Sequence, residues 1–530
     1  MGPTLPIPLA LLLLATAIAA PACGGGGSGG AGDGGEDDPG DNSTWVQDPP
    51  PVDPTPLPDA DTAEPDHVVG DGTPAGLTAA ALQAALDAGG VIVFDTGGEP
   101  ATLALGAPLA VPAFGTVVID GGNLVTLDGG GATAILRKGY RSELTVQNLA
   151  FAGARAAESG AAIDTEDWDG RLAIIDCSFT DCRTTAAGPD IGGGAVRALG
   201  QRHFQVSGST FTDCAGSNGG ALNSLGCQLT VIASSFTGCT AFGTGGGADQ
   251  GPTGQGGIGG AIYVDGVDQN ADAAVLRIDG CLFRANAAND HAGALFAYTR
   301  PGTFSDVLIN ACTFEGNAVV DPAAAGGTGG AIYTQNGDLM LTSSTFEGNE
   351  AVGNGGALWS WSSQVSRIAD CTFHGNRAGA LGGAMDLSRG IVYLSSLTIA
   401  GNDAGLFGGG IHTYPSPQVR IKNSILLANT ATDPWNGHNV SRTLLDGDGN
   451  LQWPVKRSTG TLDDTPATAT VLFVDPLLAA PADNGGPTRT LAQLPGSPAR
   501  DGGTDTARAA RDQRGYERVG AGDAGAFEGQ

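Results

Sequence analysis

The sequence predicts an all-β parallel β-helix, a solenoid of short coils stacked on one another. Two motifs that recur in phase predict this fold, together with 88 glycines in 530 residues. Along most of the chain the motifs repeat every 25 to 32 residues, and self-similarity at such a period is typical of repeat architectures. One coil of this length cannot bury its own apolar face. Stacked coils with parallel strands about 4.8 Å apart bury it against each other.

The first motif has two apolar residues separated by one position, then a small residue, then Phe followed by Asn or Cys. Leu276–Asn286 is its clearest copy. The alternation of apolar residues has the period of a β-strand. Ten copies begin at Leu144, Leu172, Phe204, Leu229, Leu276, Val307, Leu339, Ser366, Val392 and Val419. The interval from Ser234 to Cys281 is 47 residues and predicts an inserted loop.

The second motif is Gly-Gly-Ala-aliphatic, and it keeps a constant phase to the first. Its copies are Gly193–Val196, Gly219–Leu222, Gly259–Ile262, Gly329–Ile332, Gly355–Leu358 and Gly382–Met385, with looser forms at Ala292–Leu295 and Gly408–Ile411. No helical pattern separates the two motifs. Each repeat is therefore expected to carry two short strands joined by a glycine bend.

Together, the Phe-x-x-Asn and Gly-Gly-Ala-Ile motifs resemble the repeats of chlamydial polymorphic membrane proteins and other right-handed parallel β-helix proteins. The resemblance covers roughly Leu144 to Asn429. It implies the right-handed form of the fold and says little about function. It does not extend to the outer-membrane barrel with which those membrane proteins end.

Residues 1–23 are expected to be an export signal, because an apolar run from Leu9 to Ala20 precedes small residues and Cys23 and is too short to span a bilayer. This region resembles a bacterial lipoprotein signal, which implies lipid attachment at Cys23. Two features depart from it: Ala20 replaces the usual Leu, and no Lys or Arg precedes the apolar run. Plain secretion is the alternative. Residues 24–70 are Gly- and Pro-rich, with 11 acidic residues and no Lys or Arg, and predict an extended tether.

The folded part is predicted to begin at residue 71, and residues 71–430 are assigned to the β-helix with its N-terminal cap. Apolar residues from Leu77 to Ala88 have helical spacing, Gly89-Gly90 ends the helix, and Val91–Phe94 is a strand. This order resembles the cap of pectate-lyase-like β-helices. Residues 431–530 form a C-terminal accessory region. Its segments Asp483–Ala499, Asp512–Gly515 and Asp523–Glu528 resemble the choice-of-anchor Q region of bacterial surface proteins.

The composition excludes some partners. A net charge of −30 argues against nucleic-acid binding, which depends on neutralising phosphates with Lys and Arg. Three lysines form no polybasic patch, so membrane contact is expected only through the lipid anchor. An extracellular glycan or protein is the expected partner.

Two rows of polar residues are expected inside the solenoid. The asparagines that end the repeats predict a column of amides bonded to one another and to turn backbone: Asn286, Asn317, Asn349, Asn376, Asn402 and Asn429. Cys182, Cys214 and Cys239 take this position in earlier coils, and Cys281 and Cys312 adjoin in a second column. Disulfides and buried free thiols are both compatible with this spacing.

The candidate binding residues follow the Gly-Gly-Ala-aliphatic motif. The first residue after the aliphatic, and the second after that, are expected to point outward. Aromatics concentrate there, at Tyr263, Phe296, Tyr298, Tyr333, Trp359, Trp361 and Tyr414. An exposed aromatic row binds sugars or protein partners by burying apolar area. The alternative is that the inserted loop or the C-terminal region covers the row.

Acidic residues offer weaker candidates. Asp164, Asp167 and Asp169 form one compact loop and Asp446 and Asp448 another, and calcium accepts such oxygen ligands. No other cofactor is expected. Asp265 and Asp386 flank the aromatic row several coils apart, about 15–20 Å at the strand spacing, too far for paired carboxylates. His412 is expected to be an isolated, exposed edge residue. No catalytic residue is therefore predicted.

These observations favour a non-catalytic, adhesin-like surface lipoprotein that is exported to the cell envelope and presents its aromatic face to a glycan or a protein. The alternative is a polysaccharide lyase or glycoside hydrolase of the pectate-lyase-like class, which the resemblance of the scaffold implies. Fold alone does not decide between them.

Overall fold

The computed structural model describes residues 55–165, 168–244, 256–266, 274–299, 305–320, 326–504 and 509–529, all within one compact unit, Pro39–Gln530. Cys23 and Asp167, as well as the greater part of the predicted tether, lie outside these residues.

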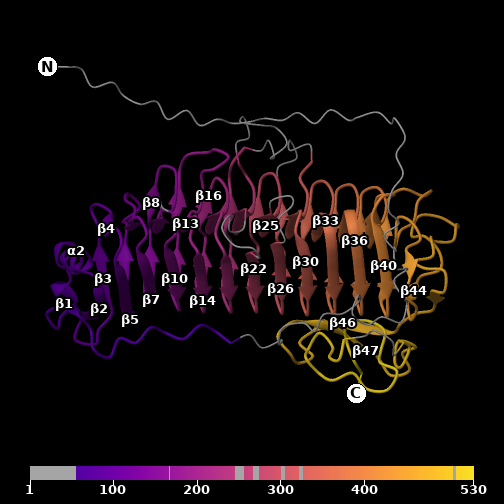
Figure 1. Ribbon diagram of the computed structural model, residues 1–530. Helices are drawn as coiled ribbons and strands as arrows, with labels where there is room; N and C mark the ends of the chain where they lie inside the picture. Colours follow the sequence, from indigo (N-terminus) through magenta and orange to yellow (C-terminus); the bar gives the residue numbers. More distant parts are fainter. Residues whose placement is uncertain are drawn as a thin grey trace, which may run out of the picture. The chain divides into compact units, whose positions relative to one another are not determined.

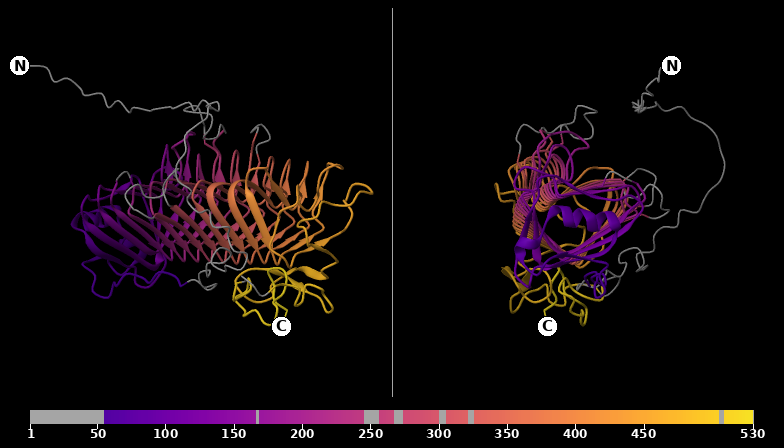
Figure 2. Two further views of the ribbon diagram at one scale, coloured as in Figure 1. Left: turned by 45° about the vertical axis from the view of Figure 1, so that its right-hand side comes forward. Right: turned by 90° about the vertical axis from the view of Figure 1, so that its left-hand side faces the viewer.

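The N-terminal cap forms as predicted but begins earlier. Helix α2 (Ala79–Ala88) follows the 3-10 turn η1 (Pro74–Gly76), and Thr78 caps it by accepting a hydrogen bond from Ala81 N. Leu82 and Leu86 pack into the core, and in Figure 2 the helix lies across the first coils. Order does not start at Asp71: β1 (His67–Gly70) pairs with β2 (Gly90–Asp95), because the apolar His67-Val-Val run supplies a strand for the first coil.

Each central coil contains four strands rather than the two predicted. One coil consists of β21 (Ile262–Asp265), β22 (Ala274–Asp279), β23 (Leu282–Arg284) and β24 (Ala287–Ala288). Left-handed residues, such as Gly280 at φ 62° and Ala285 at φ 53°, break the first motif into three pieces. Every coil pairs in parallel with the next, in the register that the repeats predicted; Leu339, for example, lies beside Ser366 (Figure 1).

The strands fall into four rows. The first row begins each coil after the glycine motif: β4 (Leu109–Val111), β6 (Leu136–Lys138), β9 (Ile163–Thr165), β13 (Val196–Leu199), β17 (Leu222–Leu225), β21, β25 (Leu295–Tyr298), β29 (Ile332–Gln335) and β39 (Ile411–Thr413). The second row contains β10 (Arg171–Ile175), β14 (His203–Ser207), β18 (Leu229–Ile232), β22, β26 (Ser305–Asn310), β30 (Asp338–Thr342) and β40 (Gln418–Lys422). Strands β33 (Leu358–Ala369) and β36 (Met385–Ser395) belong to both rows.

The third row carries the buried Phe, and the fourth consists of two-residue strands. Third-row strands are β3 (Ala101–Ala104), β11 (Ser178–Thr180), β15 (Thr210–Thr212), β19 (Ser235–Thr237), β23, β27 (Thr313–Glu315), β31 (Thr345–Glu347), β34 (Thr372–His374), β37 (Thr398–Ala400) and β41 (Ile425–Leu427). Strands β5 (Thr116–Asp128) and β7 (Glu143–Ala152) run through the second and third rows. The fourth row is β8 (Arg155–Ala156), β12 (Arg183–Thr184), β16 (Ala215–Gly216), β20 (Thr240–Ala241), β24, β28 (Ala318–Val319), β32 (Glu350–Ala351), β35 (Arg377–Ala378), β38 (Asp403–Ala404) and β42 (Thr430–Ala431).

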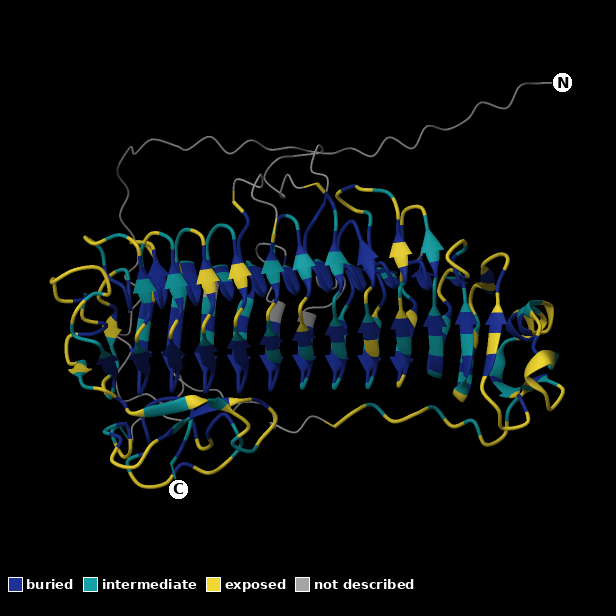
Figure 3. Cartoon of the chain, turned by 180° about the vertical axis from the view of Figure 1, so that it is seen from behind, coloured by how far each residue is buried: buried dark blue, intermediate teal, exposed yellow. Residues whose placement is uncertain are grey.

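Like residues stack inside the coils, as the repeats predicted. Eight Phe rings from Phe151 to Phe373 form one stack with centroids 4.6–5.0 Å apart and planes within 6°. The asparagine column is also confirmed: Asn317 Nδ2 donates to Asn349 Oδ1 (2.9 Å) and to the carbonyl of Phe283 (3.0 Å), and its neighbours repeat the pattern. The eight cysteines of the described residues are buried free thiols, so no disulfide joins them. Figure 3 shows the buried interior of the coils.

The solenoid continues past residue 430, where the sequence placed its end. Strands β43 (Leu445–Asp446), β44 (Leu451–Trp453) and β45 (Leu472–Phe473) extend the second and third rows. The chain then returns along the solenoid and forms the antiparallel pair β46 (Leu478–Ala482) and β47 (Thr490–Gln493).

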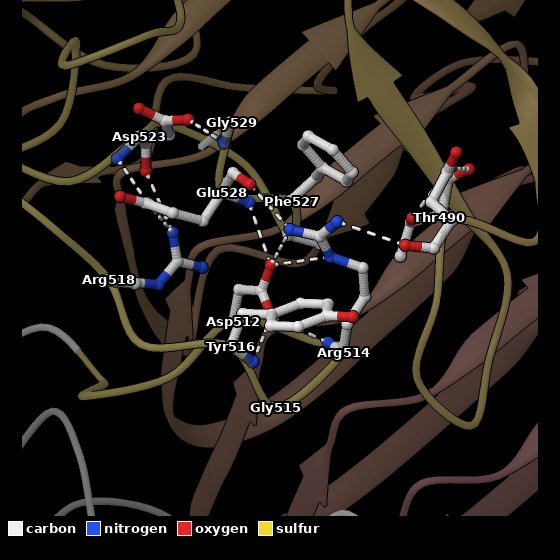
Figure 4. Close-up of polar contacts among 12 residues, drawn as sticks. Thr490, Asp512, Arg514, Gly515, Tyr516, Arg518, Asp523, Phe527, Glu528 and Gly529 are labelled. Carbon is white, nitrogen blue, oxygen red and sulfur yellow. Dashed lines mark hydrogen bonds and ion pairs between the residues drawn. The ribbon is translucent and has the colours of Figure 1, made fainter.

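The C-terminal region packs on the solenoid through buried polar groups. Arg518 is buried between Asp370 of the solenoid (2.7 Å) and Glu528 (3.3 Å), and Arg514 pairs with Asp512 (2.6 Å). Figure 4 shows Arg518, Glu528, Arg514 and Asp512 with Asp523 and Phe527. Gln513 exchanges hydrogen bonds with solenoid threonines. These contacts lie at the corner between the second and third strand rows. Near the N-terminal end of the solenoid, residues 57–62 donate hydrogen bonds to side chains at the same corner.

Candidate functional site

The predicted aromatic row forms a continuous column on the outer face of the first strand row. Backbone register aligns successive coils residue for residue. The column, called here the outer column, contains Arg197, Asn223, Tyr263, Phe296, Tyr333, Trp359, Asp386 and His412. A second line, two residues further along each strand, includes Tyr298, Trp361 and Tyr414.

The middle of the outer column is covered. Tyr263, Phe296 and Tyr333 are 7%, 3% and 8% exposed, and they pack with Ile258 and Ala292 in a cluster separate from the main core. Their rings stack in sequence, with centroids 5.2 Å apart for Tyr263–Phe296 and 4.8 Å apart for Phe296–Tyr333. The sequence left open whether this row is solvated or covered, and over these three residues it is covered.

The glycine motif itself supplies the cover. Gly259 has φ 68°, and a Cβ there would lie 2.3 Å from the carbonyl oxygen of Ile262, so only glycine fits this tight bend. The bend brings the preceding residue, Ile258, back over the strand, where it packs with the outer column. In the next coil His291 does the same, with its ring 5.1 Å from that of Tyr333. Within the described residues these two bends supply cover that the sequence did not predict, and residues 245–255 of the predicted inserted loop lie outside the described residues.

Aromatic side chains reach the surface toward the C-terminal coils. Trp359 and Trp361 on β33 are half-buried, and their rings meet edge to face with centroids 6.2 Å apart. Arg389 on β36 lies beside Trp361 in register, with its guanidinium carbon 4.9 Å from the ring centroid. Tyr414 follows on the next coil and is 37% exposed. Trp359, Trp361, Arg389 and Tyr414 are called here the C-terminal aromatic patch. Tyr298, two coils before Trp361, is half-buried.

A buried acid–imidazole pair lies beside this patch, next to Trp359 in the outer column. His412 Nδ1 is 2.8 Å from Asp386 Oδ1, and the two residues are 5% and 0% exposed. His412 was predicted to be an exposed, isolated residue, and that prediction is wrong: Phe407 and Tyr414 pack against its ring, with centroids 5.4 and 4.8 Å away. Burial raises the pKa of Asp386, and the hydrogen bond from His412 offsets part of this rise.

The second oxygen of Asp386 is the least satisfied group of the site. Asp386 Oδ2 is buried and makes no hydrogen bond of good geometry within the described residues, although Asn354 and Trp359 present donors to this carboxylate. A buried carboxylate with spare acceptor capacity can receive a hydroxyl or amide proton from a ligand or a water. Strand register was the available signal for this pair, since Asp386 and His412 occupy consecutive positions of the outer column.

The acidic residues proposed for calcium have other partners. Asp164 is buried between Arg137 (2.5 Å) and Arg197 (3.7 Å), and Asp169 lies between Arg202 (3.0 Å) and Arg141 (3.2 Å). Asp446 and Asp448 accept hydrogen bonds from Thr470. Over the described residues no group of three or more His, Cys, Asp or Glu is placed to hold a metal. Asp167 lies outside those residues, and calcium binding stays a prediction.

The comparisons with known proteins bear on the fold. A family model described as a right handed beta helix region matches residues 302–441, the coils that carry the C-terminal aromatic patch. The chain forms a right-handed parallel β-helix. A search among curated proteins finds no match. No helix in the described part of the chain is long and apolar enough to cross a membrane.

Proposed function

We propose that the protein is a non-catalytic, exported surface lipoprotein that binds a glycan through the C-terminal aromatic patch. The observation that carries the proposal is the grouping of four partly or fully exposed side chains on consecutive coils: Trp359, Trp361, Arg389 and Tyr414. Sugar rings bind by stacking on aromatic faces while polar groups bond to their hydroxyls. Export and lipid attachment rest on the sequence of residues 1–23.

Several features of the patch support a glycan as ligand. The half-buried Trp359 is fixed by Tyr333, whose ring centroid lies 4.3 Å away, so that little side-chain entropy is lost on binding. Arg389, which is exposed, supplies hydrogen-bond donors at the rim, and the Tyr414 hydroxyl can both donate and accept. Aromatic faces bordered by donors and acceptors match the alternation of C–H and O–H groups on a sugar.

Binding of the full chain to a panel of neutral and acidic polysaccharides tests the proposal. Trp361→Ala combined with Tyr414→Ala should weaken binding at least about tenfold, corresponding to about 1.4 kcal/mol. Trp435→Ala is the matched control, because this ring is 77% exposed and lies outside the patch. An equal affinity of the double variant and the wild type would remove the patch from the binding surface.

The Asp386–His412 pair favours a second candidate, cleavage of a polysaccharide. A buried carboxylate fixes the tautomer and orientation of a neighbouring imidazole, which can then accept a proton from a substrate or a water. Incubation with polysaccharides, followed by detection of unsaturated products or new reducing ends, would reveal such an activity. If an activity appears, Asp386→Asn should reduce it; products that persist unchanged in this variant would exclude the pair from the reaction.

A further inference from the structure

A second group of aromatic side chains lies near the N-terminal coils. Phe114, Tyr140 and Trp168 occur one per coil in three successive turns, and they are 72%, 46% and 41% exposed. Phe114 and Tyr140 meet edge to face with centroids 5.5 Å apart. Trp168 lies against Gly200, where a Cβ would be 2.3 Å from its ring. These three residues are called here the N-terminal aromatic patch.

Folding does not account for the exposed rings of this patch. Phe114 has φ 61°, a left-handed conformation that is strained for a bulky residue, and most of its ring stays in water. The backbone conformation of Phe114 therefore destabilises the fold by about 1–3 kcal/mol, and the burial of its ring offsets little of this. Outliers of this kind concentrate at functional sites. Arg141 and Asp169, in the next two turns, are also left-handed, at φ 53° and 76°.

The polar groups around the rings are already paired. Asp169 lies between Arg141 (3.2 Å) and Arg202 (3.0 Å), Arg171 is 3.8 Å from Glu143, and the Arg141 guanidinium lies 5.3 Å from the Tyr140 ring centroid. Such pairs present donors and acceptors together, as neutral sugar hydroxyls require. The net charge of −30 would repel an acidic polymer. The chemistry of the patch therefore fits a neutral glycan.

Both patches lie at the same corner of the solenoid. Phe114, Tyr140 and Trp168 precede the second-row positions Thr116, Glu143 and Arg171, which are in register. In later coils Trp361, which lies on β33, and Tyr414 likewise come shortly before the second-row positions Val365 and Gln418. Six coil-to-coil steps separate Trp168 from Trp361, about 29 Å at ~4.8 Å per step.

We propose that the N-terminal aromatic patch is a second site for the same neutral glycan, and that one linear polysaccharide chain spans both patches along this corner. The inference rests on the proposed function and adds the ligand's charge class, its minimum length and a second site. Rings that recur with the coils suit a ligand that is itself a repeating polymer. Binding at two linked sites raises the apparent affinity by roughly 10²–10⁴ over one site.

Titration of the full chain with a neutral polysaccharide and with its tetrasaccharide tests this inference. The tetrasaccharide should bind with a stoichiometry of two, and the polymer at least about tenfold more tightly than the tetrasaccharide. Phe114→Asn with Tyr140→Ser should reduce the stoichiometry to one and abolish the advantage of the polymer. Asn tolerates the left-handed conformation, so this variant should fold as well as the wild type, which circular dichroism checks. Trp435→Ser is the control.

The outcomes separate the two proposals. The second site is refuted if the wild type binds only one tetrasaccharide and if the polymer has the same affinity for the Phe114→Asn/Tyr140→Ser variant as for the wild type. The C-terminal aromatic patch then remains as the single site. A preference for polyuronates over neutral polymers refutes the assignment of ligand charge, and a protein bound at these rings in place of any glycan refutes the ligand class. If no polysaccharide binds the wild type, both proposals fail.

Discussion

At the scale of single residues, the cysteines show how burial decides chemistry. All eight cysteines in the described residues have buried side chains, and burial raises the pKa of Cys177 to about 12 and that of Cys227 to about 11. The thiolate is the reactive form of cysteine. The eight cysteines therefore fill the narrow interior as small buried groups.

Thiol labelling tests this arrangement. In a Cys23→Ser variant the folded protein should react with no more than a trace of an aromatic disulfide reagent at pH 8, because the remaining thiols are buried and the reagent does not reach them. After denaturation without reductant, eight thiols should react. A lower number would show that disulfides form between coils, which the spacing of the coils alone permits.

At the scale of elements, the glycine bend that precedes a first-row strand is a tight turn with a left-handed backbone, which favours glycine. Gly329 adopts φ 69° in the bend before β29, and a Cβ there would lie 2.3 Å from the carbonyl oxygen of Ile332. Gly316 adopts a similar φ of 62° between β27 and β28, yet a Cβ there would meet nothing within 4 Å. An alanine would adopt a strained left-handed conformation at either position, but only at Gly329 would its Cβ also clash with a neighbouring atom.

This contrast gives a matched pair of variants. Gly316→Ala should lower the free energy of unfolding by about 1 kcal/mol, the usual cost of a left-handed alanine. Gly329→Ala should cost clearly more, since the backbone must also move away from Ile332. Chemical denaturation measures both. Equal losses of stability would mean that the bend tolerates the added methyl group and that its close approach to the carbonyl oxygen of Ile332 does not destabilise the fold.

Sequence reasoning was accurate wherever coil follows coil without interruption. The register of Leu276, Val307 and Leu339, the Phe stack and the asparagine column all follow from the repeat, since stacking places equivalent residues in contact. Burial of Tyr263, Phe296 and Tyr333 did not follow, because it depends on the path of the glycine bend. The Asp386–His412 pair was missed because each residue was judged alone and not as a neighbour in one column.

At the scale of the whole molecule, the C-terminal region is joined to the solenoid by buried charges. Arg518 contacts Asp370 and Glu528 in a site where both partners are almost fully buried. Removal of one member of such a group leaves an uncompensated buried charge and costs about 3–5 kcal/mol, whereas replacement of both partners by apolar residues costs less.

Arg518→Met should therefore destabilise the protein by about 3–5 kcal/mol, and the added Asp370→Leu should restore part of the loss. Thermal unfolding with probes in the solenoid and in the C-terminal region would show whether the two parts separate before the coils melt. If the double variant is no more stable than Arg518→Met, the loss of stability does not come from the unpaired charge of Asp370.

The same contact should make stability depend on pH. Burial raises the pKa of Asp370 to about 6 from 3.8, although Arg518 opposes the rise. Because the pKa is higher in the folded state than in the unfolded state, protonation of Asp370 stabilises the fold. This contribution to the free energy of unfolding is fully present below about pH 4 and is lost as the pH rises to about 6. Relative to Asp370→Asn, the wild type should therefore lose stability between pH 4 and 6. A pH-independent difference would contradict this assignment.

The asparagine column also has a direction, which bears on how such a chain can lengthen. Each amide donates to the oxygen of the next coil, from Asn286 through Asn429 to Asn439, and Asn439 donates to Asp464, a carboxylate that only accepts. A duplicated coil inserted within the series would find a donor on one side and an acceptor on the other. One added beyond Asp464 would meet no donor. A coil duplicated inside the series should therefore keep these hydrogen bonds, whereas one added beyond Asp464 would lose them.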